Sequence, residues 1–260
     1  MTKLVVVGGG KMGEALLGGL LAGGWATPDE VAVVEPDAAR QSVLARRFAG
    51  ITVVGEPVAA DGAVLAVKPQ MIPDVAAQLG ALGIGRMLSI AAGVRLASIE
   101  AAVPTGTAVV RAMPNTPSLV GMGAAAIAGG TAATEADLAW AETILGAVGT
   151  VVRVTEDQIN AVTGLSGSGP AYVFLIAEAL IDAGVLVGLP REIAADLAIQ
   201  TLRGSAELLA AGTPPAEARA NVTSPGGTTA AGLRALESAG VRAALIDAVV
   251  AAATRAGEMG

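Results

Sequence analysis

The sequence contains no cysteine and no histidine among its 260 residues, and its aromatic residues are two Trp, one Tyr and two Phe. Without cysteine there is no disulfide framework and no thiolate nucleophile. Without histidine, the commonest transition-metal ligand and the commonest general acid or base are both missing. We therefore expect no metal site and a reaction that asks for little proton transfer from side chains.

Basic residues are also scarce, with 16 Lys and Arg against 23 Asp and Glu, for a net charge of −7. No stretch gathers Lys or Arg on one face, so we expect no nucleic-acid partner. The apolar stretches are broken by charges such as Lys11 and Glu14, so we expect no membrane-spanning helix and no membrane partner. The chain opens directly on a strand-like run, with no export signal, and we expect a cytoplasmic protein.

Glycine, in contrast, is abundant, and three glycines near the start have an informative spacing. Gly8, Gly10 and Gly13 form the pattern G-x-G-x-x-G between the apolar run at residues 4–7 and a helix predicted over residues 11–22. In dinucleotide-binding folds the first glycine makes the turn, the second lets the backbone approach the pyrophosphate and the third lets helix and strand pack closely. The pattern favours dinucleotide binding over a purely structural turn.

Short apolar runs alternate with helices through the first part of the chain. This alternation predicts a Rossmann-like α/β domain over residues 1–154, with a doubly wound parallel sheet. We expect strands at residues 4–7, 31–34, 51–54, 63–67, 87–90, 108–111, 124–128 and 151–154.

Residues 155–260 contain no strand-like run and predict an all-helical substrate-binding and dimerisation domain. The expected helices are 157–163, 171–187, 192–210, 215–221, 229–238 and 241–255, with a glycine-rich break at 164–170. The helix at 171–187 is apolar almost all round, so it needs cover on most sides. We expect a second subunit to supply that cover; the alternative is a central helix of a monomeric bundle.

The carboxyl ends of parallel strands form the expected ligand edge. Lys68 stands there, either to meet a phosphate or as a surface contact. Asn115, between two prolines, either directs its amide at a nicotinamide or forms an Asx turn. In the helical part, the glycine-rich starts at 164–170 and 224–229 would expose N–H groups to a small carboxylate. A cationic iminium would suit such a protein, because it is already electrophilic and the cofactor supplies the hydride.

Six motifs follow one another along almost the whole chain. They are Gly8-Gly9-Gly10-Lys11-Met12-Gly13, Ala66-Val67-Lys68-Pro69-Gln70, Ser89-Ile90-Ala91-Ala92-Gly93, Arg111-Ala112-Met113-Pro114-Asn115-Thr116-Pro117, Ser166-Gly167-Ser168-Gly169-Pro170-Ala171-Tyr172 and Val222-Thr223-Ser224-Pro225-Gly226-Gly227-Thr228-Thr229. Together, and in this order, they resemble one enzyme family, pyrroline-5-carboxylate reductase. The last two motifs are the specific ones.

The resemblance implies reduction of 1-pyrroline-5-carboxylate to L-proline with NADPH or NADH, in a homodimer or a decamer made of dimers. It implies that Thr229 is the catalytic residue, hydrogen-bonded to the ring nitrogen, and that Glu156 lines the substrate site. Ser224 with the backbone of Gly226, Gly227 and Thr228 would hold the substrate carboxylate. The expected cofactor-binding residues are Gly8, Gly9, Gly10, Lys11, Met12, Gly13, Glu35, Ala66, Val67, Lys68, Pro69, Ile90, Ala91, Ala92, Asn115 and Asn221.

Glu35 departs from the family pattern, which often has a small hydroxyl residue near the adenosine ribose. A carboxylate there would accept a hydrogen bond from a 2′-OH and repel a 2′-phosphate. The alternative is that Glu35 points to solvent and Arg40 binds the phosphate. The family's usual NADPH is the expected cofactor, with NADH as the other candidate.

Two other functions stay open at this stage. A 3-hydroxyacid dehydrogenase of the 6-phosphogluconate type shares the pattern Gly164-x-x-Gly167-x-Gly169, but it has a catalytic lysine where this chain has Val173. A non-catalytic, cofactor-sensing dimer would need the helical packing, but it would not need the hydroxyl-rich loop at 224–229. That loop therefore favours the reductase.

Overall fold

A computed structural model describes residues 2–259, and the contacts within it divide the chain into two compact units. The first unit contains the residues up to Ser168 together with those from Val250 onward. The second unit is Gly169–Val249. The last strand ends at Arg153, next to the boundary expected after residue 154, whereas the division by contacts lies further along the chain.

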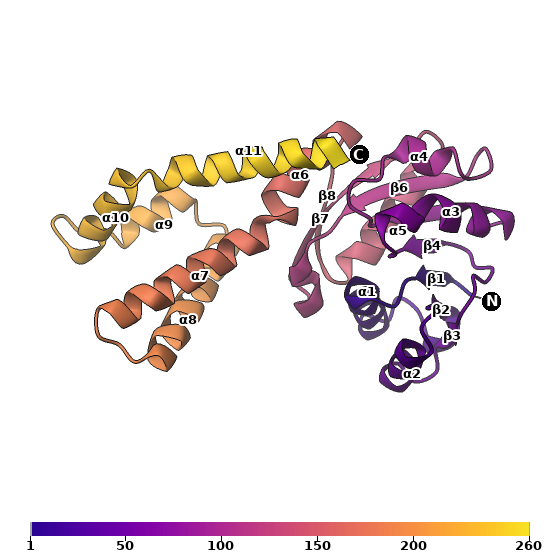
Figure 1. The fold of residues 1–260 in the computed structure, drawn as a ribbon, viewed down its shortest axis with the longest axis horizontal. Helices are drawn as coiled ribbons and strands as arrows, with labels where there is room; N and C mark the ends of the chain where they lie inside the picture. The colour runs from indigo at the N-terminus through magenta and orange to yellow at the C-terminus, as the bar shows by residue number, and fades with distance from the viewer. Residues whose placement is uncertain (1, 260) are drawn as a thin grey trace. The chain divides into compact units, whose positions relative to one another are not determined.

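The first unit is built on one sheet of eight strands in the order β3-β2-β1-β4-β5-β6-β7-β8 (Figure 1). The strands are β1 (Leu4–Val7), β2 (Val31–Val34), β3 (Thr52–Val54), β4 (Ala63–Leu65), β5 (Arg86–Ser89), β6 (Ala108–Met113), β7 (Gly123–Gly129) and β8 (Gly149–Arg153). Strands β1 to β6 are parallel and have the order of a Rossmann fold. The predicted α/β fold is confirmed.

The last two strands run opposite to the rest of the sheet, which was predicted to be all parallel. Strand β7 pairs antiparallel with β6, and β8 is parallel to β7. Only residues 114–122 connect β6 to β7, and their one regular element is the short 3₁₀ helix η3 (Thr116–Val120). A parallel crossover needs about a dozen residues or more. The short connection therefore makes the chain turn back, a constraint that the strand pattern alone did not reveal.

Helices cover both faces of the sheet because the strands are apolar on both faces. On one face Val6 packs with Leu16 of α1 (Lys11–Ala22) and Ile144 of α5 (Glu135–Gly146). On the other face Val5 packs with residues of three helices, α3 (Ile72–Ala81), α4 (Leu96–Glu100) and α6 (Ile159–Val162). The remaining elements of this unit are α2 (Ala38–Arg47), the 3₁₀ helices η1 (Pro28–Glu30), η2 (Pro69–Met71) and η4 (Glu156–Gln158), and the π-helix η5 (Thr163–Gly167).

The regular elements of the second unit are all helices, joined by short loops. Its elements are α7 (Gly169–Leu186), α8 (Arg191–Ala210), α9 (Pro215–Asn221), α10 (Thr228–Ser238) and α11 (Val241–Met259), which continues into the first unit. Helices α7 and α8 lie side by side (Figure 1). The side chains of Phe174 and Leu175 are 61% and 66% exposed. The alternative of α7 as the buried centre of a monomeric bundle is therefore wrong.

The predicted break at 164–170 is also wrong, because the helix runs through it. The N–H of Ser168 donates to the oxygen of Thr163 at 2.8 Å, the i to i−5 bond of a π-turn, and α7 follows directly. The glycine-rich segment is therefore not the free helix start that was expected there, and binding of a carboxylate by it stays a prediction. By length and composition alone, the resulting helix Glu156–Leu186 could cross a membrane, contrary to the expectation, although this is weak evidence.

Candidate functional site

In the glycine turn after β1, two of the three glycines lie in close contact with neighbouring backbone atoms. Gly8 has φ +108°, and a Cβ there would lie 2.5 Å from the oxygen of Ala66 at the end of β4. A Cβ on Gly13 would lie 2.2 Å from the oxygen of Gly8. Gly10, in contrast, has no protein atom within 4 Å of where its Cβ would be. The first and third glycines serve the protein's own packing, whereas the space beside the second is open to a ligand.

This open space lies at the start of α1, where a dinucleotide's pyrophosphate would bind. Gly10 is the N-cap and offers no side chain to the helix, so the first N–H groups of α1 have no acceptor within the helix. Those groups carry the positive end of the helix dipole. The turn and the start of α1 contain Gly9, Lys11, Met12 and Gly13, whose contact with a coenzyme stays a prediction. The N–H of Gly9 has another partner. The geometry fits a phosphate.

That partner is Glu35, which follows β2. Its Oε2 accepts a hydrogen bond from the N–H of Gly9 at 3.0 Å, and its Oε1 accepts one from the N–H of Asp37 at 3.1 Å. Arg40, the residue of the competing interpretation, donates from Nε to the oxygen of Gly9 at 2.7 Å and pairs with Glu14. The carboxylate of Glu35 is thus held against the glycine turn, and the alternative in which it points to solvent is not what the structure shows.

The ends of β4 and β5 continue the same edge of the sheet. Ala66 donates to the oxygen of Val7 at 2.8 Å, and Ile90 donates to the oxygen of Leu65 at 3.2 Å. Lys68 is exposed at the start of η2. These bonds bring the segments 66–69 and 90–92 to the edge that carries the glycine turn. The expected set, Ala66, Val67, Lys68, Pro69, Ile90, Ala91 and Ala92, is therefore gathered in one unit.

Asn115 uses both ends of its amide inside the protein. Its Nδ2 donates to the oxygen of Ser166 at 3.0 Å, and its Oδ1 accepts from the N–H of Ala124 at 2.8 Å. Ser166 lies four residues before Pro170, which has no N–H to complete the usual helix bond. Asn115 therefore ties the segment after β6 to β7 and to the π-turn. Binding of a nicotinamide by this side chain remains a prediction.

Glu156 and Arg111 form a shielded ion pair beside the start of α4. Nη1 of Arg111 donates to Oε1 of Glu156 at 2.9 Å, and the N–H of Leu96 donates to the same oxygen at 2.6 Å. The side chain of Arg111 is 5% exposed and that of Glu156 is 31% exposed. In the structure, Glu156 therefore fixes the side chain of Arg111 and the first residue of α4. Sequence reasoning gave Arg111 no role, although a lone arginine in an apolar strand was a signal for a buried pair.

Unequal burial predicts unequal stability effects for the two partners of this pair. Glu156→Ala should cost about 3 kcal/mol, because it leaves a buried guanidinium unpaired. Arg111→Met should cost less, because the half-exposed carboxylate can be hydrated and methionine fills the space. Thermal unfolding of both variants checks this. The double variant should be more stable than Glu156→Ala alone, and equal losses in the two single variants would contradict the explanation.

The hydroxyl-rich loop lies in the second unit and leads into α10. Gly226 has φ +70°, and a Cβ on Gly227 would lie 2.4 Å from Oγ of Ser224. Gly227 is the N-cap of α10 and, having no side chain, leaves the first N–H groups of the helix open, with Thr228 and Thr229 in the first turn. The predicted helix start at 224–229 is confirmed. Asn221 ends α9 and is exposed.

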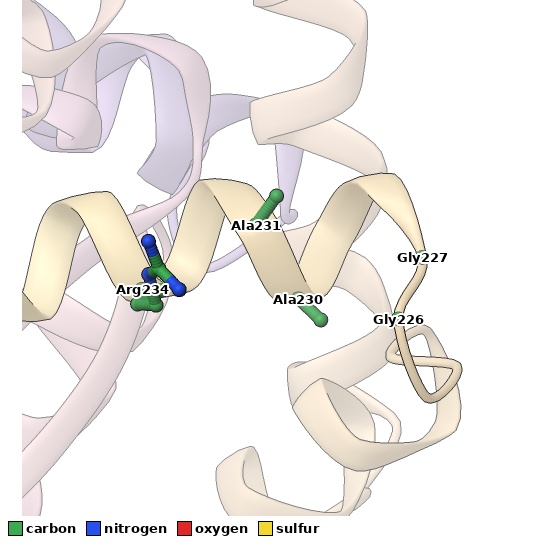
Figure 2. A pocket seen from close by; sticks show the side chains of 5 residues that line it. All are labelled: Gly226, Gly227, Ala230, Ala231 and Arg234. Carbon is green, nitrogen blue, oxygen red and sulfur yellow. The ribbon is translucent and has the colours of Figure 1, made fainter.

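A hollow of about 360 Å³ lies along the start of α10 (Figure 2). Gly226, Gly227, Ala230, Ala231 and Arg234 line it. At the far end of α10, Arg242 donates three hydrogen bonds of 2.7–3.0 Å to Glu237. These bonds hold the pKa of the Glu237 carboxyl below its usual value. The hollow offers N–H groups and small side chains to an anionic ligand.

The fold and the glycine turn define a dinucleotide-dependent oxidoreductase with a helical second domain. A family model described as pyrroline-5-carboxylate reductase dimerisation matches residues 156–259. A second, described as NADP oxidoreductase coenzyme F420-dependent, matches residues 3–93.

Full-length relatives make the family explicit. The chain is 46% identical to the pyrroline-5-carboxylate reductase of Synechocystis, over 99% of this chain and 98% of that protein. It is 40% identical to that of Arabidopsis thaliana, over 99% and 95%. The solved reductase from Coxiella burnetii covers 100% of this chain and 98% of its own, at 36% identity and a TM-score of 0.93. The chain belongs to the pyrroline-5-carboxylate reductase family.

Proposed function

We propose that this protein reduces 1-pyrroline-5-carboxylate to L-proline with hydride from NAD(P)H, the last step of proline biosynthesis. Family membership over the full chain supports the reaction. The observation that carries it is the pair of uncapped helix starts, at Gly10 for a pyrophosphate and at Gly227 for a carboxylate. The hydroxyl-rich loop beside the second helix start has no use in a non-catalytic scaffold.

In this proposal the residues of the loop orient an imino acid. The N–H groups at the start of α10 and the hydroxyl of Ser224 hold its carboxylate, and Thr229 accepts a hydrogen bond from the protonated ring nitrogen. Hydride adds to the carbon of the C=N bond, the bonding pair moves to nitrogen, and the N–H already present is kept. No side-chain acid or base is needed, which suits a chain without histidine or cysteine. Glu156 and Asn221 stay proposed contacts of substrate and cofactor.

An absorbance assay of the purified full chain tests the reaction. We expect oxidation of NADH or NADPH that depends on added pyrroline-5-carboxylate, together with slower, proline-dependent reduction of the oxidised coenzymes. A 3-hydroxyacid substrate should give nothing, because Val173 stands where those dehydrogenases have their lysine. Absence of imine-dependent oxidation with both coenzymes would refute the proposal.

We further propose NADH, rather than the NADPH expected from the resemblance, as the preferred coenzyme. The solved Plasmodium falciparum relative has NADP bound, and it is 30% identical to this chain. Here, however, Glu35 is fixed against Gly9, where its carboxylate accepts from a ribose 2′-OH and repels a 2′-phosphate. We expect kcat/KM to be about tenfold higher with NADH, a difference of ~1.4 kcal/mol. A clear preference for NADPH would contradict this role of Glu35.

We also propose that the protein works as a homodimer, alone or assembled into a decamer, in the cytoplasm. The helical half matches the family's dimerisation domain, and α7 exposes large apolar side chains that a second copy would cover. Sedimentation of the purified protein should give at least twice the mass of one 25.3 kDa chain. A monomer at micromolar concentration would oppose the assembly but not the reaction.

A further inference from the structure

Two side chains of opposite charge flank Gly9 in the cofactor turn. Glu35 accepts from its N–H at 3.0 Å, and Arg40 donates to its oxygen at 2.7 Å. In dinucleotide folds an acid at this edge binds the ribose 2′-OH, whereas an arginine nearby accommodates a 2′-phosphate. This chain places both kinds of residue on Gly9, so the charge of the subsite depends on whether the guanidinium is already neutralised.

Glu14 supplies that neutralisation from α1. Its Oε2 pairs with Nη2 of Arg40, and its Oε1 pairs with Nη1 of Arg47 at 2.5 Å. The side chain of Glu14 is 12% exposed and that of Arg40 is 28% exposed, so salt screens their attraction only weakly. Nε of Arg40 is thus bonded to Gly9 and Nη2 to Glu14, so the charge of the guanidinium is paired with a carboxylate of α1.

The second source of positive potential at this subsite is neutralised as well. Helix α2 begins at Ala38, and its first turn would present free N–H groups to an anion. Oδ1 of Asp37 accepts from the N–H groups of Ala39 and Arg40 at 2.8 and 3.3 Å. A 2′-phosphate would therefore meet Glu35 with both neighbouring positive groups already paired with carboxylates.

We propose that Glu14 is a specificity-determining residue: by pairing with Arg40 it keeps that guanidinium from a 2′-phosphate, and so makes the site select NADH. Glu14 acts through Arg40 and is a positioning residue. The inference rests on the proposed function only for the identity of the coenzyme pair.

The test measures dissociation constants of NADH and NADPH by fluorescence titration, without imino acid. Glu14→Gln keeps the shape of the side chain but removes the charge, and should tighten NADPH binding about tenfold, the size of one charged hydrogen bond. The dissociation constant for NADH should change by less than about twofold on the same reasoning. Arg47→Gln is the matched control, because it removes the other partner of Glu14 and should leave the ratio of the two constants unchanged.

Two further variants test the role of Arg40, and the first of them keeps the proposal falsifiable if Glu14→Gln folds poorly. Arg40→Gln in the native background should leave the ratio nearly unchanged, because its charge is already compensated. The double variant Glu14→Gln, Arg40→Gln should lose the gain for NADPH. Equal changes for both coenzymes in Glu14→Gln, or a gain that persists without Arg40, would overturn the proposal. Since the titration needs no substrate, failure of the proposed reaction gives a different pattern, with coenzyme binding intact and turnover absent.

Discussion

Alanine at Gly13 is expected to destabilise the first unit severely, whereas alanine at Gly10 should leave it folded and weaken dinucleotide binding. A Cβ on Gly13 would lie 2.2 Å from the backbone oxygen of Gly8, which cannot move without shifting β1. Overpacking typically costs about 1–3 kcal/mol, and the upper end applies here because the atom that is met belongs to the backbone. A Cβ on Gly10 meets no protein atom within 4 Å, and φ there is −67°, which alanine adopts readily.

The two variants control for each other. Thermal unfolding should separate them, with a lower midpoint for Gly13→Ala and an unchanged one for Gly10→Ala. Coenzyme titration should then show that Gly10→Ala binds NADH at least about tenfold more weakly, because a methyl group occupies the space of close backbone approach. Normal coenzyme binding by a stable Gly10→Ala protein would mean that the pyrophosphate does not bind at this turn.

Thr229→Ala should lower kcat/KM for the imino acid about 100-fold, because a hydrogen bond to a charged group is worth ~1.5–3 kcal/mol. Thr229 lies in the first turn of α10, and no side chain caps the start of this helix. The hydroxyl is not needed for the fold, so the unfolding midpoint should hardly move. Steady-state kinetics at saturating coenzyme measure the effect.

Thr223→Ala is the matched control for that experiment. Thr223 lies directly before the same loop, but its hydroxyl donates to the oxygen of Arg219 at 2.6 Å and so stabilises the end of α9. It should retain turnover close to that of the native protein. If Thr229→Ala were as active as Thr223→Ala, Thr229 would be removed from the proposed mechanism.

Local sequence patterns predicted local structure well. The helix at 11–22, the strand at 31–34 and the helix at 215–221 were predicted with the bounds that the structure has, because apolar periodicity, glycine and proline mark them clearly. The predictions were wrong where the structure depends on the length of a connection or on an unusual helical hydrogen bond. The direction of β7 follows from the length of a connection, and the glycine-rich segment at 164–170 stays helical through a π-turn.

In the candidate site, too, features that depend on local spacing could be predicted, whereas contacts between distant residues could not. The glycine turn and the position of Glu35 beside it could be predicted from the sequence, because both depend on spacing along one βαβ unit. The pair of Arg111 with Glu156 joins residues 45 positions apart, and that of Arg40 with Glu14 joins residues 26 apart. The position of Arg111 within an apolar strand indicates a buried pair, but a single sequence does not identify its partner, and Arg40 and Glu14 each resemble an ordinary surface charge.

The amide of Asn115 has one more implication, for substitution at that position. The side chain must donate at one end, to a carbonyl left open by Pro170, and accept at the other, from the N–H of Ala124. Aspartate has the same size but is an acceptor at both ends, so it would bring a negative charge against the oxygen of Ser166. Size alone therefore does not decide which residues are tolerated at position 115. Asn115→Asp hardly changes the volume of the side chain, and we nevertheless expect it to be harmful.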